Sequence, residues 1–209
     1  MDEMGVLKKY TGVLMHDFWP AYAKYSCQHA YCNAHIIREL QGVFDGFKQE
    51  WAKDMRKLLE EMYSRVFKEE AGLSEAEIQE FGDRYDKIVG QGELANPKPQ
   101  KKKGKKGRTK NTKGGNLVNR LKKHKHEVLR FLTTNGEIPF TNNQAERDIR
   151  MMKVQQKISG TFRTETGATE FAIIRGYIST MRKQDQSVFQ ALKGLPVAQP
   201  VLISSLGAE

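Results

Sequence analysis

The feature that most constrains the fold of this chain is a lysine-rich segment near its middle. Residues 94–126 contain no acidic residue and hold thirteen of the 35 lysines and arginines. Without these thirteen, 22 basic residues face 25 acidic ones, so this stretch alone makes the protein basic. Its part at residues 94–115 is rich in Lys, Gly, Pro and Thr, and has too few apolar side chains to offset the entropy lost on folding. We therefore expect a mobile basic linker there.

The first part of the chain, residues 1–47, has the pattern of a small α/β unit. Residues 12–17 form a short apolar run that ends in a polar pair, which is typical of a buried strand. Pro20 suits the first turn of a helix, where its missing N–H has no effect. Residues 28–31 are a second short strand candidate, and residues 32–47 have a one-sided apolar stripe that predicts a helix.

The second part, residues 48–135, is predicted to be a helical insertion that contains the linker. Residues 55–66 carry apolar side chains at helical spacing, and Ser74 with Glu77 matches a capping box before another stripe. This helix pair is expected to end near residues 90–92. A further helix is predicted to start at about Leu117 and to continue to Leu132.

The third part, residues 136–195, is predicted to be mainly helical. Residues 138–141 should be extended around Pro139. Asn142 or Asn143 should cap a helix that carries Glu146, and a loop at residues 158–166 should lead to a long buried helix that begins near Ala168. Residues 196–209 are expected to form a loose tail.

Several classes of protein are disfavoured by composition. No apolar run approaches the roughly 20 residues of a membrane helix, and no basic start precedes an apolar stretch as in a secretory signal. The two cysteines, Cys27 and Cys32, cannot form a disulfide framework, so a cytoplasmic location is expected. No membrane partner is expected either.

Two acids, Asp17 and Glu146, are candidates for metal chemistry. Asp17 follows the first predicted strand, and Glu146 lies in the first turn of a predicted helix. Each also has a structural interpretation, Asp17 as a solvated strand end, and Glu146 as a capping-box residue after Asn143 or as a partner of Arg150. Carboxylates that converge from these positions would suit Mg²⁺, which prefers oxygen ligands and leaves sites open for phosphate.

Three ordered segments resemble the transposases of the IS66-type insertion sequences. Residues 12–22 are similar to the family's segment around its second catalytic aspartate. Residues 32–40 (CNAHIIREL) resemble the Cys-x-Ala-His-x-x-Arg-Glu/Lys signature that follows it. Residues 141–150 (TNNQAERDIR) resemble the segment with the catalytic glutamate, and residues 151–160 and 171–183 continue the likeness. The similarity extends from Gly12 to about Leu195 and is weakest in the basic linker.

The resemblance implies an RNase H-like fold with an Asp, Asp, Glu triad. Asp17 would be the second acid and Glu146 the third, and together they would hold two Mg²⁺ or Mn²⁺ ions. Water would then cleave the ends of the element, and the freed 3′-hydroxyl would attack target DNA. The first aspartate has no counterpart upstream of Asp17, so we expect an incomplete catalytic domain that is inactive alone. An upstream region or a separate chain would supply the missing strands, and the active state would be an oligomer.

Basic residues are candidates for contacts with DNA phosphates. Lysines without interleaved aromatics attract the backbone and do not read bases. The alternative is a solvated tether and a solvated helix face. The candidate residues are Lys101, Lys102, Lys103, Lys105, Lys106, Arg108 and Lys110 in the linker, and Arg147, Arg150, Lys153 and Arg163 near Glu146.

A second metal hypothesis concerns four residues with the spacing C-x-H-x₂-C-x₂-H. Thiolate and imidazole ligands suit zinc, but this spacing is tighter than that of zinc fingers and has no distant second pair. A buried Cys32 and a hydrogen-bonded His35 explain the same residues without metal. The four residues are Cys27, His29, Cys32 and His35.

The fold class predicted from the sequence is α+β, mostly helical, as a partial RNase H-like fold with a large helical insertion. The predicted function is DNA transposition by a transposase-family catalytic-domain fragment. Two alternatives remain open at this stage, a non-enzymatic DNA-binding or regulatory protein and a zinc-stabilised interaction module.

Overall fold

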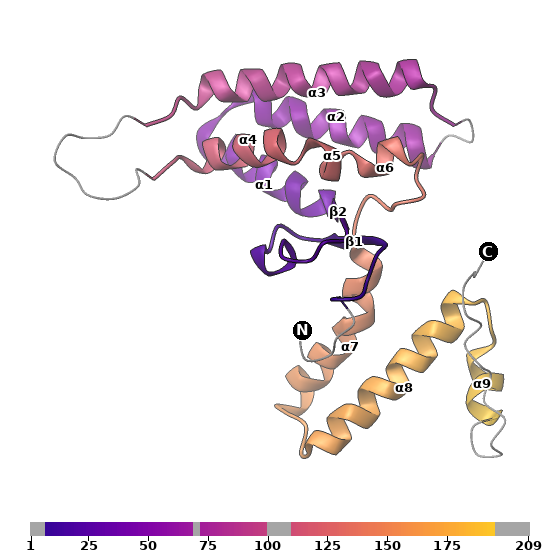
Figure 1. Ribbon diagram of the computed structural model, residues 1–209. Helices are drawn as coiled ribbons and strands as arrows, with labels where there is room; N and C mark the ends of the chain where they lie inside the picture. Colours follow the sequence, from indigo (N-terminus) through magenta and orange to yellow (C-terminus); the bar gives the residue numbers. More distant parts are fainter. Residues whose placement is uncertain (1–6, 69–71, 100–109, 195–209) are drawn as a thin grey trace. The chain divides into compact units, whose positions relative to one another are not determined.

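The computed structural model describes residues 7–68, 72–99 and 110–194. It divides into two compact units, unit 1 up to Asn142 and unit 2 from Asn143, and each is described by itself. Within the described ranges the chain is mostly helical and has one two-stranded sheet (Figure 1). This confirms the α+β class at the level of secondary structure. No helix in the described ranges is long and apolar enough to cross a membrane.

The sheet of unit 1 lies where the sequence predicts it. Strand β1 (Val13–His16) pairs in parallel with β2 (Gln28–Tyr31), and Leu14 lies opposite His29. The connection contains a 3₁₀ helix, η1 (Pro20–Tyr22), with its proline in the first turn. Both strand predictions and the proline prediction are therefore confirmed.

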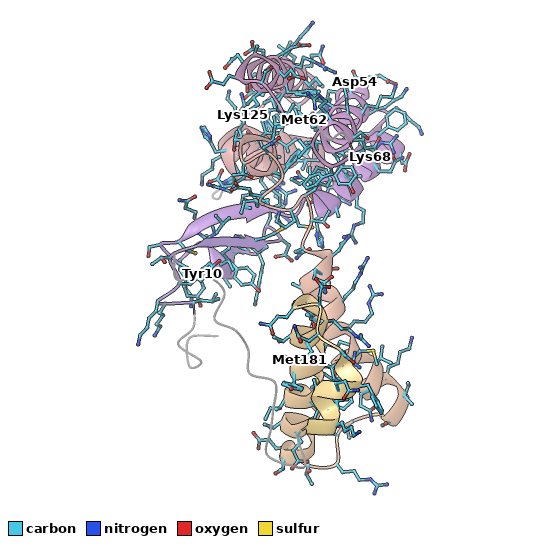
Figure 2. All side chains as sticks on the ribbon, turned by 90° about the vertical axis from the view of Figure 1, so that its right-hand side faces the viewer. Tyr10, Asp54, Met62, Lys68, Lys125 and Met181 are labelled. Atoms are coloured by element: carbon cyan, nitrogen blue, oxygen red, sulfur yellow. The ribbon has the colours of Figure 1, made fainter. Side chains whose placement is uncertain are left out.

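A block of helices forms the rest of unit 1. It contains α1 (Asn33–Phe47), α2 (Glu50–Phe67), α3 (Glu75–Ala95) and α4 (Lys113–Lys123). In Figure 1, α3 and α2 run side by side, as their packing requires, and α4 packs on α3 and α1. Figure 2 shows this block with its helices nearly end-on, and the fully buried Met62 lies among them.

The helix α3 extends beyond the end predicted from its glycines. It continues through Gly90 and Gly92 to Ala95. At Gly92 an added Cβ would lie only 2.6 Å from Val118 Cγ2 and 3.0 Å from Trp51. The glycine therefore allows close packing of α3 against α2 and α4 instead of ending the helix. The capping box is confirmed, since Ser74 accepts from the Glu77 N–H and Glu77 accepts from the Ser74 N–H.

The linker is shorter than the predicted 94–115 because structured residues fasten both of its ends. Asn96 is buried at the end of α3, and its amide group bonds to Gln49 and to the Gly92 carbonyl. The Thr112 hydroxyl donates to Asn96 Oδ1 (2.9 Å) and also caps α4 through the Gly115 N–H. Residues 100–109, with Lys101 to Arg108 among them, lie outside the described residues.

The single helix predicted from Leu117 to Leu132 is instead three segments. These are α4, α5 (Lys125–Val128) and α6 (Arg130–Thr133). Buried side chains follow one another too densely for one face of a continuous helix, at Val128, Leu129, Phe131 and Leu132. The breaks at His124 and Leu129 let these side chains turn into the core of unit 1.

Unit 2 consists of α7 (Asn143–Ser159), α8 (Glu165–Lys183) and α9 (Val188–Gly194). The connection between α7 and α8 is shorter than predicted, because α7 continues to Ser159 and the Thr164 hydroxyl already caps α8. The prediction of a long buried helix is wrong for α8. Only Met181 of α8 is buried, while Ile173 and Ile174 are 65% and 52% exposed. Figure 2 labels Met181 among the helices of this unit.

Candidate functional site

The Asp17 side chain lies at the carboxyl end of β1 and is held by its immediate neighbours. It is half-buried, and its Oδ1 accepts a hydrogen bond from the Trp19 N–H at 3.1 Å. Phe18 stacks on Tyr31 with 3.9 Å between ring centroids. The segment after β1 is thus anchored to β2, and the carboxylate has a defined position with lone pairs left for a ligand.

Two histidines form a row of contacts that begins at the backbone carbonyl of Asp17. His16 is only 5% exposed, its Nδ1 is bonded to the Asp17 carbonyl, and its Nε2 lies 2.9 Å from His29 Nδ1. His29 Nε2 lies 3.0 Å from the Tyr25 carbonyl. Burial lowers the pKa of His16, and the nearby His29 acts in the same direction, while the hydrogen bond to the Asp17 carbonyl raises it.

Counting protons shows what this row of contacts requires. The row has three contacts. Two join a ring nitrogen to a carbonyl oxygen, and one joins ring nitrogens of the two histidines. Two neutral imidazoles supply only two N–H groups. All three can be hydrogen bonds only when the pair holds a third proton.

A pattern in the sequence indicates this pair once the strand register is known. Leu14 lies opposite His29 in the parallel register, and side chains alternate along a strand. His16, two residues after Leu14, must therefore lie on the same face as His29. Without the register, the sequence spacing alone groups His29 with Cys27 and Cys32 as a zinc candidate.

Two of the four zinc candidates, His29 and Cys32, have other side-chain partners in the structure. Both ring nitrogens of His29 are engaged, as described above. Cys27 and Cys32 are buried free thiols, and Cys32 Sγ accepts from the Asn142 N–H at 3.5 Å. The backbone N–H of His35 donates to the Cys32 carbonyl in the first turn of α1. Within the described ranges no three His, Cys, Asp or Glu side chains are grouped closely enough to hold a metal ion.

The end of unit 1 is fastened beside the sheet. The Cys32 N–H donates to the His16 carbonyl (3.0 Å), and the Asn33 N–H donates to the Phe140 carbonyl (3.0 Å). The buried Asn33 side chain also donates to the Val128 carbonyl (3.1 Å). Residues 140–142 are therefore hydrogen bonded to Cys32 and Asn33, which follow β2. Cys32 is in turn bonded to His16, the residue before Asp17.

Glu146 lies in the first turn of α7 and is half-buried. Since α7 begins at Asn143, Glu146 is the fourth residue of the helix. An acid in the first turn is favoured by the helix dipole. The capping-box interpretation of Glu146 stays a prediction.

The cations around Glu146 are exposed and have no acidic partner. Arg147, Arg150 and Lys153 lie on α7, and Arg163 lies in the connection to α8. None of these four makes an ion pair with a described residue. Lys110, the one linker candidate within the described ranges, is also exposed. These cations remain candidates for phosphate contacts.

Comparison with known proteins gives one match. A family model described as "Transposase IS66 family" matches residues 3–170, well over half of the 209 residues. The match includes β1 with Asp17, the helical block and all of α7. Searches of curated proteins and of solved structures gave no significant match.

Proposed function

This chain belongs to the IS66 family of transposases, and on that premise we propose that Asp17 and Glu146 are two of the acids that hold divalent ions for its DNA chemistry. Membership in the family supports a role in DNA transposition and implies DNA as the partner. The RNase H-like architecture is part of the proposal, with β1 and β2 as two of its strands.

The observation that carries the proposal is the hydrogen-bonded path from Asp17 toward α7. The Cys32 N–H bonds to the His16 carbonyl, and the Asn142 N–H bonds to Cys32 Sγ. Glu146 follows Asn142 by four residues, which is about 6 Å of helical rise. The residue four positions before Glu146 is therefore hydrogen bonded to the segment that follows β2.

The chemistry of the two residues fits hard cations. Carboxylate oxygens are the ligands that Mg²⁺ and Mn²⁺ prefer, and both side chains are half-buried instead of fully solvated. When bound, two such ions supply activation of an attacking oxygen and stabilisation of a leaving one. The contacts of His16 with the Asp17 carbonyl and with His29 position the Asp17 backbone.

Mn²⁺ binding by the full chain, followed by electron paramagnetic resonance, tests this proposal. We expect Asp17→Asn and Glu146→Gln each to weaken Mn²⁺ binding at least about tenfold, because each removes a charged ligand. The matched controls are Asp45→Asn, at an exposed α1 position, and Glu165→Gln, in the first turn of α8. Unchanged affinity in both site variants would contradict the proposal. Salt-dependent DNA binding that accompanies this result would favour a non-enzymatic DNA-binding protein.

A further inference from the structure

Unit 2 contains a cavity of about 380 Å³ that is lined only by side chains of α7 and α8. Four cations and one acid surround it, so its formal charge is strongly positive. The residues on which the argument rests are Arg147 and Asp148 from α7, and Arg175, Ser179, Arg182 and Lys183 from α8.

The acid and the lysine neutralise each other and fix the walls of the cavity. Asp148 accepts from Lys183 Nζ (2.5 Å) and from Ser179 Oγ (2.5 Å). Both bonds lower the pKa of the Asp148 carboxyl group, and the bond from Lys183 has the larger effect. Asp148 is therefore ionised at neutral pH. The two bonds also join α7 to α8, which holds the two helices that carry the arginines in register.

The three arginines are left without acidic partners. Arg147, Arg175 and Arg182 make no ion pair with a described residue, although Arg175 is half-buried. Arg175 and Arg182 are seven residues apart, two turns along one face of α8, and Arg147 faces the same cavity from α7. With Asp148 neutralised by Lys183, the three guanidinium groups leave the cavity strongly positive, which favours the entry of an anion.

We propose that this cavity is a phosphate-binding site that takes a backbone phosphate of bound DNA. A guanidinium group donates two parallel hydrogen bonds to phosphate oxygens, and three such groups from two helices can surround one phosphodiester. The inference rests on the proposed function, because it adds Arg175 and Arg182 to the DNA contacts of the unit that carries Glu146. Contacts of this kind set the position of the duplex and do not read its sequence.

The test uses the full chain and a fluorescein-labelled 30-base-pair duplex of arbitrary sequence, with anisotropy measured at several salt concentrations. We expect Arg175→Gln and Arg182→Gln each to weaken binding about five- to thirtyfold at low salt. Each should also reduce the slope of log affinity against log salt by about one. Arg175→Lys keeps the charge and should lose less affinity than the Gln variant while retaining the slope. Arg84→Gln is the control, because this arginine on α3 lies outside the quoted family segments and pairs with Glu61.

Several outcomes overturn the inference. Affinities and salt slopes of both Gln variants within twofold of the starting chain, an equal loss in Arg84→Gln, or no duplex binding at all would each do so. Calorimetry with inorganic phosphate separates the two sources of the anion. Phosphate binding that disappears in Arg182→Gln while DNA affinity stays unchanged would assign the cavity to a free anion. Circular dichroism checks that each variant folds. If Arg175→Gln does not fold because Arg175 is half-buried, the exposed Arg182 still provides the test through Arg182→Gln. Mn²⁺ binding by Asp17 and Glu146 is a separate measurement, so either proposal can fail alone.

Discussion

The two units of this chain use the same residue types in opposite ways. In unit 1 several arginines of the helical block are paired, among them Arg65 with Glu77, Arg84 with Glu61 and Arg120 with Glu39. In unit 2 the described arginines have no acidic partner, and three of them line one cavity. Unit 1 also buries a large apolar cluster, whereas α8 buries only Met181. The difference indicates that unit 1 is built for stability and that unit 2 presents a surface to a ligand.

The largest expected effect is on the core of unit 1. Leu59 on α2 is fully buried in the apolar cluster, so Leu59→Ala should lower the free energy of unfolding by about 2–5 kcal/mol. Ile174→Ala on the exposed face of α8 should change it by less than about 0.5 kcal/mol. Urea denaturation followed by circular dichroism measures both. Equal losses would break the comparison between the units.

A smaller effect is expected from a buried hydroxyl in unit 1. Tyr85 is fully buried, and its OH donates to the Leu121 carbonyl at 3.1 Å, which joins α3 to α4. Tyr85→Phe should destabilise the chain by about 1–3 kcal/mol, because the carbonyl keeps its burial and loses its donor. Tyr63→Phe, at an exposed position on α2, is the control in the same denaturation assay. A loss no larger than that of the control would show that water or another donor reaches Leu121.

Arginine substitutions in the two units should have opposite consequences. Arg84→Gln removes an exposed ion pair with Glu61 and should lower stability by about 0.2–1 kcal/mol, with DNA affinity unchanged. Arg182→Gln should leave stability unchanged and weaken DNA binding. Thermal melting and anisotropy on the same samples compare them. If both variants lost only stability, unit 2 would have no special role in binding.

The smallest expected effect is a pH dependence at the start of α3. Hydrogen bonds from the Ser74 N–H and hydroxyl, with that from Arg65, lower the pKa of Glu77 from its usual 4.5 to about 2. The stability that ionised Glu77 contributes to the fold is therefore fully present above pH 4.5 and is lost as the pH falls through about 2. Glu77→Gln should be less stable than the starting chain at pH 6, and the gap should narrow below pH 4.5 and close only below about pH 2. Glu75→Gln, outside the capping box, should show no such closing gap in urea titrations.

Local patterns predicted much of the fold. The strands at residues 13–16 and 28–31, the proline at the start of η1 and the Ser74 capping box depend on neighbouring residues, and the structure confirms them. The errors arose where tertiary packing decides. Gly92 permits close helix packing instead of ending α3, and the apolar residues of α8 are largely exposed.

The candidate site was predictable only in part. Asp17 and Glu146 followed from a resemblance to a family, since a lone carboxylate has many structural explanations. The pairing of His16 with His29 needed the strand register. The arginine cavity joins residues 35 positions apart on two helices, and spacing within one helix reveals only the relation of Arg175 to Arg182.

Cleavage of the protein backbone by bound iron tests the central claim most directly. Fe²⁺ replaces Mg²⁺ at carboxylate sites, and with ascorbate and peroxide it cuts the chain near its ligands. The account predicts cuts close to both residue 17 and residue 146 in the full chain, and loss of both cuts in Asp17→Asn as well as in Glu146→Gln. Cuts near only one acid, or a cut near residue 146 that persists in Asp17→Asn, would contradict a shared cation site.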